Sequence, residues 1–343
     1  MEKLVSVIIP CFNAQRWLAE TIDSCLQQTY PHIEIIVVDD GSTDKSLEII
    51  KSFQDKITWV TGPNRGGNYA RNKGFALSKG KYIQYLDADD YILPEKIAMQ
   101  VQALEELGGD VVYSDWRYKK HLPNGTSYFE EVEVCGPKND FLESLLSNHR
   151  WVPLVGLLFT REAVINKGCW DERLKAAQDR DFLMTIAIND GKFVYQSGCH
   201  SIYRRHDDIT VSTSCRLRWL NSHSHVMEKA EKRLSQLGKL FPNYRQALAT
   251  AYFDFGRDYL YGNFPDIDYD KYSRFLQSVD QALALFPEFK SSKRSTAHYL
   301  IQKLFGCRRS EMITYYLTRI KLLFRSFSLV VKERKWLDYA WNR

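Results

Sequence analysis

The stretches Ile35-Ile36-Val37-Val38-Asp39-Asp40-Gly41-Ser42 and Tyr82-Ile83-Gln84-Tyr85-Leu86-Asp87-Ala88-Asp89-Asp90 decide the fold of this chain. Each is a short β-branched and aromatic run that ends in aspartates, which is the pattern of a buried parallel strand. Ligands of open α/β sheets bind beyond the carboxyl ends of such strands, so we expect these carboxylates to meet in one crevice. So much negative charge requires a positive partner, and a divalent cation that holds an anionic ligand such as a diphosphate is the simplest one.

Strands and helices alternate through the first part of the chain. We expect strands over residues 4–9, 34–39, 57–61, 81–86 and 110–116, and helices over 14–28, 95–107 and 139–148, with further helices after Ser42 and through Arg71. This order predicts an α/β fold with a right-handed, mostly parallel sheet. The polar segment 117–135 is expected to form a hairpin or a loop.

Strand patterns fade after about residue 215, and the remaining sequence has the character of helices. We therefore expect an α/β domain over residues 1–215 and a helical C-terminal region over 216–343. Within that region, Tyr252-x-x-Phe255-Gly256-x-x-Tyr259 and Ala282-Leu283-x-x-x-Pro287 resemble one tetratricopeptide-type helix pair. A single pair cannot build a solenoid, so we expect a helical appendage packed on the core.

The composition is that of an ordinary globular protein of 343 residues, 44% hydrophobic and 26% charged. Its seven cysteines include no C-x-x-C pair, which argues against a disulfide framework or a zinc site and favours a reducing compartment. We find no signal-peptide pattern and no apolar run long enough to span a bilayer, so we expect a cytoplasmic protein.

The net charge of +5 is concentrated at the C-terminal end. Residues 303–343 hold ten Lys or Arg and three Asp or Glu, so the rest is close to neutral and nucleic-acid binding is not expected. Between residues 310 and 332, polar and apolar positions fall on opposite faces of one helix. This basic amphipathic tail either makes peripheral contact with an anionic membrane, here its inner face, or covers the protein's own core.

Five motifs in sequence order resemble the pattern of family 2 glycosyltransferases. They are Ser6-Val7-Ile8-Ile9-Pro10-x-Phe12-Asn13, Val37-Val38-Asp39-Asp40-Gly41-Ser42-Thr43-Asp44, Asn64-x-Gly66, Ala70-Arg71-Asn72-x-Gly74 and Asp87-Ala88-Asp89-Asp90. The resemblance covers about residues 3–212 and implies the GT-A fold, a mostly parallel sheet flanked by helices. It also implies a nucleotide-sugar donor, whereas the residues alone indicate only a site for a metal and a diphosphate.

The resemblance implies that the donor binds where the strands end. The donor-binding residues that it implies are Pro10, Phe12, Asp39, Asp40, Arg71, Asp87 and Ala88. Asp40 would accept hydrogen bonds from the base or ribose, and Arg71 would contact the nucleotide or the diphosphate. Alternatively, Asp39 and Asp40 only cap the next helix, and Arg71 is a surface residue.

The D-x-D pair of Asp87 and Asp89 implies a bound Mg²⁺ or Mn²⁺ ion, because hard oxygen ligands suit these cations. In the family, the second carboxylate binds the metal, and the first contacts ribose or the metal sphere; Asp89 is therefore the expected metal ligand. Asp90 either caps the helix after Pro94 or is solvated.

His206 closes the segment Tyr203-Arg204-Arg205-His206, which resembles the Arg-x-His segment of the family. It is expected to complete the metal sphere or to bind the diphosphate, with a structural role as the alternative. Either Arg204 or Arg205 could hold a phosphate, and the sequence does not choose between them.

Two further segments, Gly168-Cys169-Trp170-Asp171-Glu172 and Gln178-Asp179-Arg180-Asp181-Phe182, resemble the acceptor side of the family. Asp179 aligns with the general base, which implies an inverting displacement in which it takes the acceptor's proton. The usual first acid is Gln178 here, which removes a neighbouring charge and leaves the base. Alternatively, Asp179 and Asp181 only cap a helix over 180–189. Trp151 could stack on a sugar, but we favour a place in the core.

We therefore expect a metal-dependent, inverting glycosyltransferase that moves a sugar from a UDP-sugar to a hydroxyl of a glycan or lipid-linked acceptor. A nucleotidyltransferase also uses strand-end aspartates and a metal, but Pro10–Arg16 lacks the glycine-rich basic loop of that class. A scaffold that binds a nucleotide sugar without turnover is the non-enzymatic alternative, and the presence of Asp87, Asp89 and Asp179 argues against it.

Overall fold

The computed structural model describes residues 3–138, 140–147, 152–206, 215–262, 271–287, 306, 309, 311–313 and 315. Trp151 and, apart from 311–313 and 315, the predicted tail helix between residues 310 and 332 lie outside this part of the chain. The chain divides into two compact units, Met1–Tyr244 and Arg245–Arg343. The domain boundary expected near residue 215 remains a prediction, but the first compact unit extends 29 residues beyond it, to Tyr244.

A mixed sheet of nine strands forms the centre of the first unit among the described residues, in the order β3-β2-β1-β4-β8-β6-β9-β5, with β7 paired to β6. The strands are β1 (Val5–Cys11), β2 (Ile33–Asp39), β3 (Thr58–Thr61), β4 (Tyr82–Tyr85), β5 (Tyr91–Ile92), β6 (Val111–His121), β7 (Ser127–Glu133), β8 (Leu157–Thr160) and β9 (Phe193–Arg205). The half that contains β1 to β4 is entirely parallel, as predicted. The direction reverses at β8, which is antiparallel to both of its neighbours.

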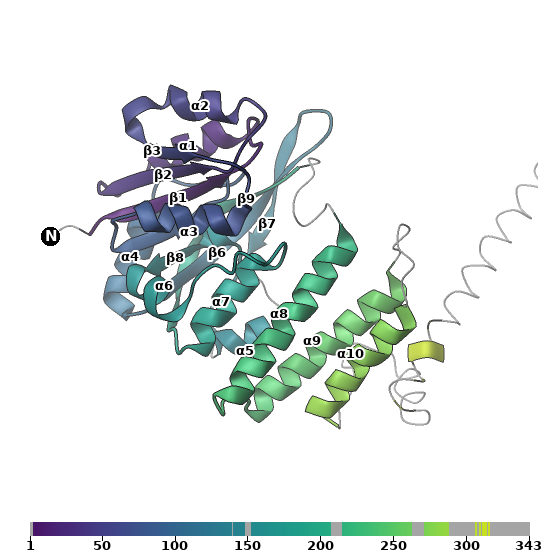
Figure 1. The fold of residues 1–343 in the computed structure, drawn as a ribbon. Coiled ribbons are helices and arrows are strands. Elements are labelled where there is room, and N and C mark those ends of the chain that lie inside the picture. The colour runs from purple at the N-terminus through teal and green to yellow at the C-terminus, as the bar shows by residue number, and fades with distance from the viewer. Residues whose placement is uncertain are drawn as a thin grey trace, which may run out of the picture. The chain divides into compact units, whose positions relative to one another are not determined.

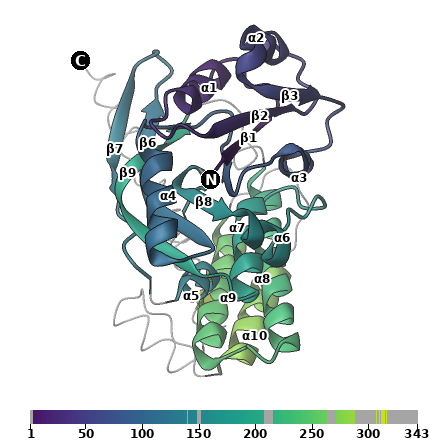
Figure 2. The same ribbon diagram turned by 90° about the vertical axis from the view of Figure 1, so that its left-hand side faces the viewer.

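Helices cover both faces of this sheet, which confirms the predicted α/β class. They are α1 (Leu18–Leu26), α2 (Ser46–Ser52), α3 (Gly67–Leu77), α4 (Lys96–Leu107), α5 (Phe141–Leu146), α6 (Arg161–Lys167), α7 (Gln178–Ile188) and α8 (Arg216–Gln236), with 3₁₀ turns over Gln54–Lys56 and Leu154–Gly156. Helix α3 runs across β1 and β2 (Figure 1), and α4 lies across β6, β8 and β9 (Figure 2).

The side chains of β1 show why α3 and α4 lie on opposite faces. Val7 and Ile9 belong to the core cluster that includes α1 and α4, whereas Ile8, between them, points to α3. A Cβ atom at Gly74 of α3 would lie only 2.4 Å from Cγ2 of Ile8, so glycine permits this close approach. The strand β1 therefore packs between two helical layers.

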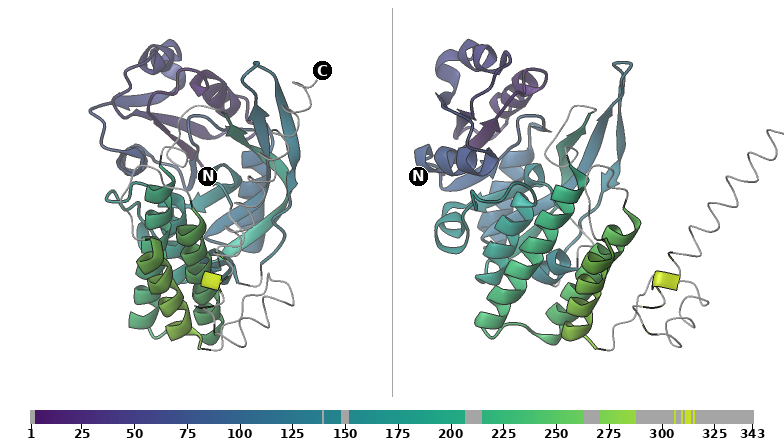
Figure 3. Two further views of the ribbon diagram at one scale, coloured as in Figure 1. Left: turned by 90° about the vertical axis from the view of Figure 1, so that its right-hand side faces the viewer. Right: turned by 45° about the vertical axis from the view of Figure 1, so that its right-hand side comes forward.

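The segment expected to be a hairpin or loop forms the hairpin of β6 and β7, which rises beyond the neighbouring strands (Figure 3). Three strands were not predicted, and one of them, β5, has only two residues. β8 has only four residues after a 3₁₀ turn, and β9 contains polar residues and register shifts around Gly198, whose φ is 108°. Neither offers the alternation that identifies a strand from sequence.

The second unit contains the expected helix pair, formed by α9 (Pro242–Tyr261) and α10 (Lys271–Leu285). A Cβ atom at Gly256 would lie 3.1 Å from Cβ of Ser278, so the two helices approach closely at this glycine. None of the helices in the described ranges is both long and apolar enough to cross a membrane.

Candidate functional site

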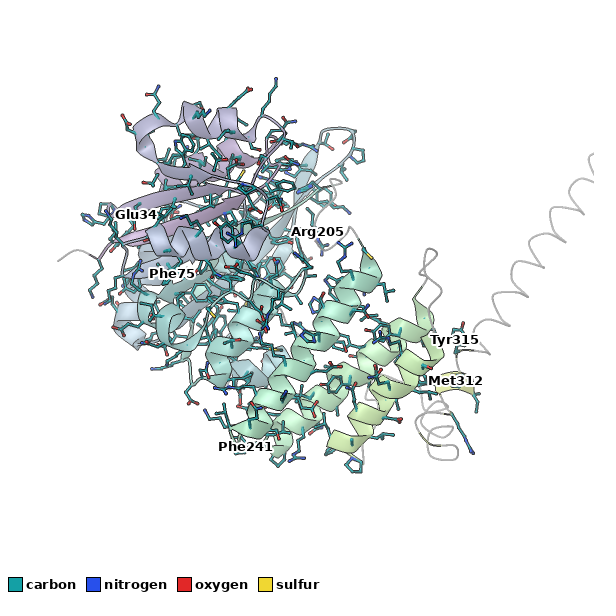
Figure 4. All side chains as sticks on the ribbon, viewed as in Figure 1. Glu34, Phe75, Arg205, Phe241, Met312 and Tyr315 are labelled. Atoms are coloured by element: carbon teal, nitrogen blue, oxygen red, sulfur yellow. The ribbon has the colours of Figure 1, made fainter. Side chains whose placement is uncertain are left out.

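The predicted site residues lie at the carboxyl-terminal edge of the parallel strands. Cys11 and Asp39 are paired neighbours at the ends of β1 and β2. Figure 4 shows Glu34, near the start of β2, and Arg205, at the end of β9, on opposite sides of the unit. The sheet therefore brings the ends of β1, β2 and β4 to a common edge, where a ligand of an open α/β sheet is expected.

The loop after β1 is fastened to the loop after β2 by side-chain hydrogen bonds. The Oδ1 atom of Asn13 accepts from the backbone N–H of Thr43 at 2.8 Å, and the Oγ atom of Ser42 accepts from the N–H of Asn13 at 3.0 Å. Phe12, beside them, is 50% exposed and follows Pro10 by two residues. An apolar ring thus stands open to solvent at this edge, and its contact with a donor remains a prediction.

Asp39 and Asp40 are buried, and their carboxylates bind the end of β3 and the loop that follows it. Asp39 accepts the hydroxyl of Thr61 at 2.6 Å, and Asp40 accepts the backbone N–H groups of Arg65 at 2.8 Å and Gly66 at 2.7 Å. The alternative that they cap the next helix is wrong, because the first turn of α2 is bonded by Asp44, which accepts from the N–H of Ser46.

Arg71 is a buried residue, 8% exposed, and the alternative of a surface arginine is wrong. Its Nη2 atom lies 2.6 Å from Oδ1 of Asp87. Its Nη1 atom donates to the side-chain oxygens of Asn68 at 3.3 Å and Gln178 at 3.4 Å, and its guanidinium lies 4.7 Å from the ring centre of Trp170. One cation therefore connects the D-x-D turn with the predicted acceptor side.

Hydrogen bonds from α1 and β9 hold the D-x-D turn in place. The hydroxyl of Thr21 on α1 lies 3.0 Å from the carbonyl oxygen of Ala88 and 2.7 Å from that of Asp90. The Asp90 carboxylate is buried and accepts the N–H of Arg204 at 2.8 Å, so the expectation of a helix cap or a solvated acid is wrong. Burial, followed by the charges of Asp89 and Asp87, raises the pKa of Asp90 well above its ordinary value.

Of the two arginines near the end of β9, only Arg204 is close to the D-x-D turn. Its Nη1 atom donates to the carbonyl oxygen of Asp89 at 2.6 Å, and its Nη2 atom donates to Glu20 at 2.7 Å. Arg205 lies over the ring of Tyr118 at 3.6 Å, on the hairpin of β6 and β7. Arg204 thus supports the turn, whereas Arg205 lies against the hairpin of β6 and β7.

Asp89 and His206 form the pair that fits a metal ion. The Nε2 atom of His206 lies 3.2 Å from Oδ2 of Asp89, and the Asp89 side chain is 35% exposed. Carboxylate oxygen with imidazole nitrogen is a donor set that suits a cation such as Mn²⁺. In the described ranges no three His, Cys, Asp or Glu residues lie close enough to form a metal site by themselves, so further ligands would come from substrate or water.

Asp179 lies in the first turn of α7, after Ala177, whose φ of 57° is in the left-handed region. Its Oδ1 atom accepts the N–H of Arg180 at 2.9 Å. The pKa of Asp87 is raised by burial first and then, despite Arg71, by the charges of Asp89 and Asp179. Asp179 is therefore close enough to Asp87 for its charge to act on that carboxyl group, and strained backbone precedes the candidate base.

Four residues near Asp179 make contacts that the sequence did not predict, although Asn72 and Trp170 belong to motifs that carry the family resemblance. Asn68 and Asn72, one turn apart on α3, donate to the carbonyl oxygens of Asp171 at 2.7 Å and Trp170 at 3.0 Å. Trp170 stacks on Phe182 of α7 at 4.2 Å, and Lys229 of α8 binds the carboxylates of Asp171 and Asp181. The four-residue spacing of Asn68 and Asn72 could have indicated that both side chains lie on one face of a helix. Nothing in the sequence indicated a role for Lys229.

Comparisons with known proteins agree with this geometry. Residues 6–149 match the family model described as Glycosyl transferase family 2. The chain is 38% identical over 232 residues to glycosyltransferase GlyG of Streptococcus pneumoniae serotype 4, covering 61% of this chain and 76% of that protein. It is 46% identical over 218 residues to the uncharacterized glycosyltransferase RT0329 of Rickettsia typhi, covering 62% and 67%.

The fold also has solved counterparts. The structure of S. aureus TarS 1–349 in complex with UDP-GlcNAc aligns with a TM-score of 0.62 at 19% identity, covering 83% of this chain and 82% of the TarS chain. TarS 1–349 without that ligand aligns with a TM-score of 0.60 over 83% and 81%. At this identity the likeness shows a common fold.

Proposed function

The chain belongs to family 2 of the glycosyltransferases, and from this premise we propose that it transfers a sugar from a nucleotide sugar to a hydroxyl group, with inversion at the anomeric carbon. The supporting observation is that the buried Arg71 lies 2.6 Å from Asp87 of the D-x-D turn and also donates to Gln178, the residue before Asp179, so these distant parts of the sequence come together. Inverting transfer needs an anion-binding side and one base on the opposite side of the sugar.

We propose a UDP-sugar as the donor. Pro10, Phe12, Asp39 and Asp40 would bind its nucleoside, and Arg71, Asp87 and Ala88 would lie along its ribose and diphosphate. Each carboxylate oxygen of Asp40 already accepts one loop N–H and retains a lone pair for a uracil N–H or a ribose hydroxyl. The UDP-GlcNAc bound to TarS in the solved complex supports this donor class by analogy of fold.

Asp89 and His206 would hold a Mg²⁺ or Mn²⁺ ion, which would neutralise charge on the departing nucleoside diphosphate. The 3.2 Å separation of Nε2 and Oδ2 supports the assignment, because both atoms already point to one place. Arg71 holds the neighbouring Asp87 and so limits the repulsion between the two aspartates.

Asp179 would act on the acceptor. The acceptor oxygen attacks the anomeric carbon, the bond from that carbon to the diphosphate oxygen breaks, and the acceptor proton passes to the Asp179 carboxylate. The contacts from α3 to the segment 170–172 hold this side of the site in place. The role of Gln178 would be to bind Arg71 without adding a charge beside the base.

We propose that the acceptor is a glycan or a lipid-linked molecule and that the enzyme works in the cytoplasm. The basic tail, residues 303–343, would then attach it peripherally to the inner face of the membrane, since each basic residue near an anionic surface contributes about 1 kcal/mol. Co-sedimentation with anionic liposomes tests this. A Lys321/Arg325/Lys332→Gln triple variant that pellets as well as the wild type at low salt would leave the tail without a membrane role.

The experiment that tests the function begins with a screen of nucleotide sugars for metal-dependent thermal stabilisation, because a ligand that binds the folded state raises its stability. The best donor is then incubated with candidate glycan acceptors, and the anomeric configuration of the product is read by NMR. Inverted product confirms the proposal. Retained configuration contradicts the mechanism, metal-dependent binding without turnover indicates the scaffold, and release of pyrophosphate from a nucleoside triphosphate indicates the nucleotidyltransferase.

A further inference from the structure

A cationic side chain is buried between α7 and α8 without a full set of partners. Arg180 is 4% exposed, and in the described part of the chain its Nε and Nη1 atoms have no hydrogen-bond partner. His223 of α8 is 8% exposed, and its Nδ1 atom also has none there. Leaving a buried polar group unpaired is unfavourable, and more so for a charged one.

Two positive charges act on His223, whereas the negative charge of Asp179 acts on Arg180. Arg180 and Arg216 both act on His223 and, after burial as the main cause, lower its pKa to about 3. Burial lowers the pKa of Arg180 to about 10, which leaves the guanidinium charged at neutral pH. Trp219 lies on α8 between Arg216 and His223. Its ring centre is 3.9 Å from that of His223 and 4.2 Å from the guanidinium of Arg216.

Elsewhere between α7 and α8, buried carboxylates are paired with a lysine. Asp181, the next residue on α7, is buried and paired at 2.8 Å with Lys229 of α8, and the same lysine lies 3.1 Å from Asp171. The two carboxylates in this part of the interface therefore pair with one ammonium group. The unpaired atoms of Arg180 stand out against this background, and they point to a partner that is not part of the described chain.

We propose that Arg180 and His223 bind an anionic group of the acceptor, a phosphate ester or a carboxylate, while Asp179 takes the proton from the reacting hydroxyl of the same molecule. This inference rests on the proposed function, because it needs Asp179 to be the base. Successive residues on a helix point about 100° apart. Asp179 can thus act beside Asp87 while Arg180 points to α8, where it acts on His223.

The test measures anion binding with the donor site already filled. Wild-type protein saturated with UDP and Mn²⁺ is titrated with glycerol 3-phosphate, inorganic phosphate and glucuronate, and binding is followed by calorimetry. The first probe carries a phosphate ester, the second reports the bare anion and the third reports a carboxylate. We expect saturable binding of at least one probe.

The variants are Arg180→Met and His223→Gln, with Arg218→Met on the exposed face of α8 as the matched control. Loss of a charge-assisted contact should weaken binding of that probe about 10- to 100-fold in Arg180→Met, and more weakly in His223→Gln, with no change in Arg218→Met. Because the methionine removes an unpaired buried charge, Arg180→Met should fold; if it does not, His223→Gln decides.

Two outcomes overturn the inference. Either the UDP-loaded wild type binds none of the three probes, or the variants bind them as tightly as Arg218→Met does. The binding of UDP itself reports separately on the proposed function. A protein that binds UDP and no anion refutes only the acceptor site, whereas a protein that binds no nucleotide refutes the proposed function.

Discussion

The Nη2 atom of Arg71 on α3 lies 2.6 Å from the Oδ1 atom of Asp87, the first aspartate of the D-x-D turn. Arg71 is almost fully buried, and its other terminal nitrogen reaches Asn68 and Gln178. The pair offsets part of the repulsion between Asp87 and Asp89, which acts to raise the pKa of Asp87. Asp89 remains directed toward His206.

Replacing Arg71 should therefore weaken donor binding. In Arg71→Met the positive charge is lost, and we expect the affinity for UDP in the presence of Mn²⁺ to fall about 10- to 100-fold. Arg71→Lys can keep the pair with Asp87 but cannot also reach Asn68 and Gln178, so its loss should be smaller. Calorimetry measures both, with Lys73→Met, an exposed residue of α3, as the control. Equal affinity in all three variants would remove Arg71 from the donor site.

Asp89→Ala should abolish metal-dependent binding of a nucleoside diphosphate while the fold persists. The turn keeps its shape because Arg204 binds the backbone carbonyl of Asp89 and not its side chain. UDP binding is measured with Mn²⁺ and with a chelator, and Asp55→Ala, an exposed acid, is the control. If wild type and Asp89→Ala bind UDP equally well without metal, the metal assignment is wrong.

Asp179→Asn should lower turnover by about two to four orders of magnitude, the usual contribution of general-base catalysis, with donor affinity little changed. The amide keeps the size of the side chain and an oxygen that can accept the N–H of Arg180, so α7 should be undisturbed. Transfer rates and UDP affinity are measured on the same preparation. Near-wild-type transfer by this variant would exclude Asp179 as the base.

The sequence predicted the parallel half of the sheet because β1, β2 and β4 are continuous apolar runs that end in turn residues. The runs alone pointed to a gathering of aspartates at their ends; β2 and β4, which these aspartates follow, both pair in parallel with β1, and the binding of one ligand between them remains a prediction. Asp179 and the other residues implied only by motif resemblance had no such support from a local pattern. Their roles remain predictions until variants are measured.

The features that were not predicted depend on contacts between residues far apart in the sequence, and no local pattern indicates such contacts. The strand β8 is short, and β9 is polar and irregular, so neither shows a clear period. The supports of the site are also distant in sequence: Arg204 lies 115 residues from Asp89, and Lys229 lies 48 residues from Asp181. A buried charge looks like an exposed one in a sequence, which is why Asp90 was expected to be a cap or a solvated acid.

The acid sensitivity of the protein should depend on His223. Its folded-state pKa is lowered to about 3, mainly by burial, whereas the unfolded chain has the ordinary value near 6.5. The unfolded state therefore binds the extra proton as the pH falls below about 6.5, and stability is lost down to about pH 3. At pH 5 this amounts to about 2 kcal/mol, measured by urea unfolding in phosphate-free buffer. His223→Gln should lose less stability over this range, and an unchanged pH profile would contradict the shift.

Lys229 of α8 lies 2.8 Å from the carboxylate of Asp181 on α7 and 3.1 Å from that of Asp171, so it connects α8 with the helix that carries Asp179. Burial raises the pKa of Asp181 and the lysine lowers it, whereas hydrogen bonds from Arg173 and Lys229 lower the pKa of Asp171. This interaction places α8 with the catalytic part of the chain, and we predict that a protein ending near residue 215 would be unstable.

Lys229→Met should therefore lower the free energy of unfolding by about 1–3 kcal/mol, less than a fully buried pair would lose, because the lysine itself is 38% exposed. The cost arises mainly from the unpaired, buried charge of Asp181, so Asp181→Asn in the same chain should restore part of it. The double variant Asp181→Asn/Lys229→Met is thus expected to be more stable than the two single effects added together. Urea unfolding of the wild type and the three variants completes the cycle, and strict additivity would show that the two side chains do not interact.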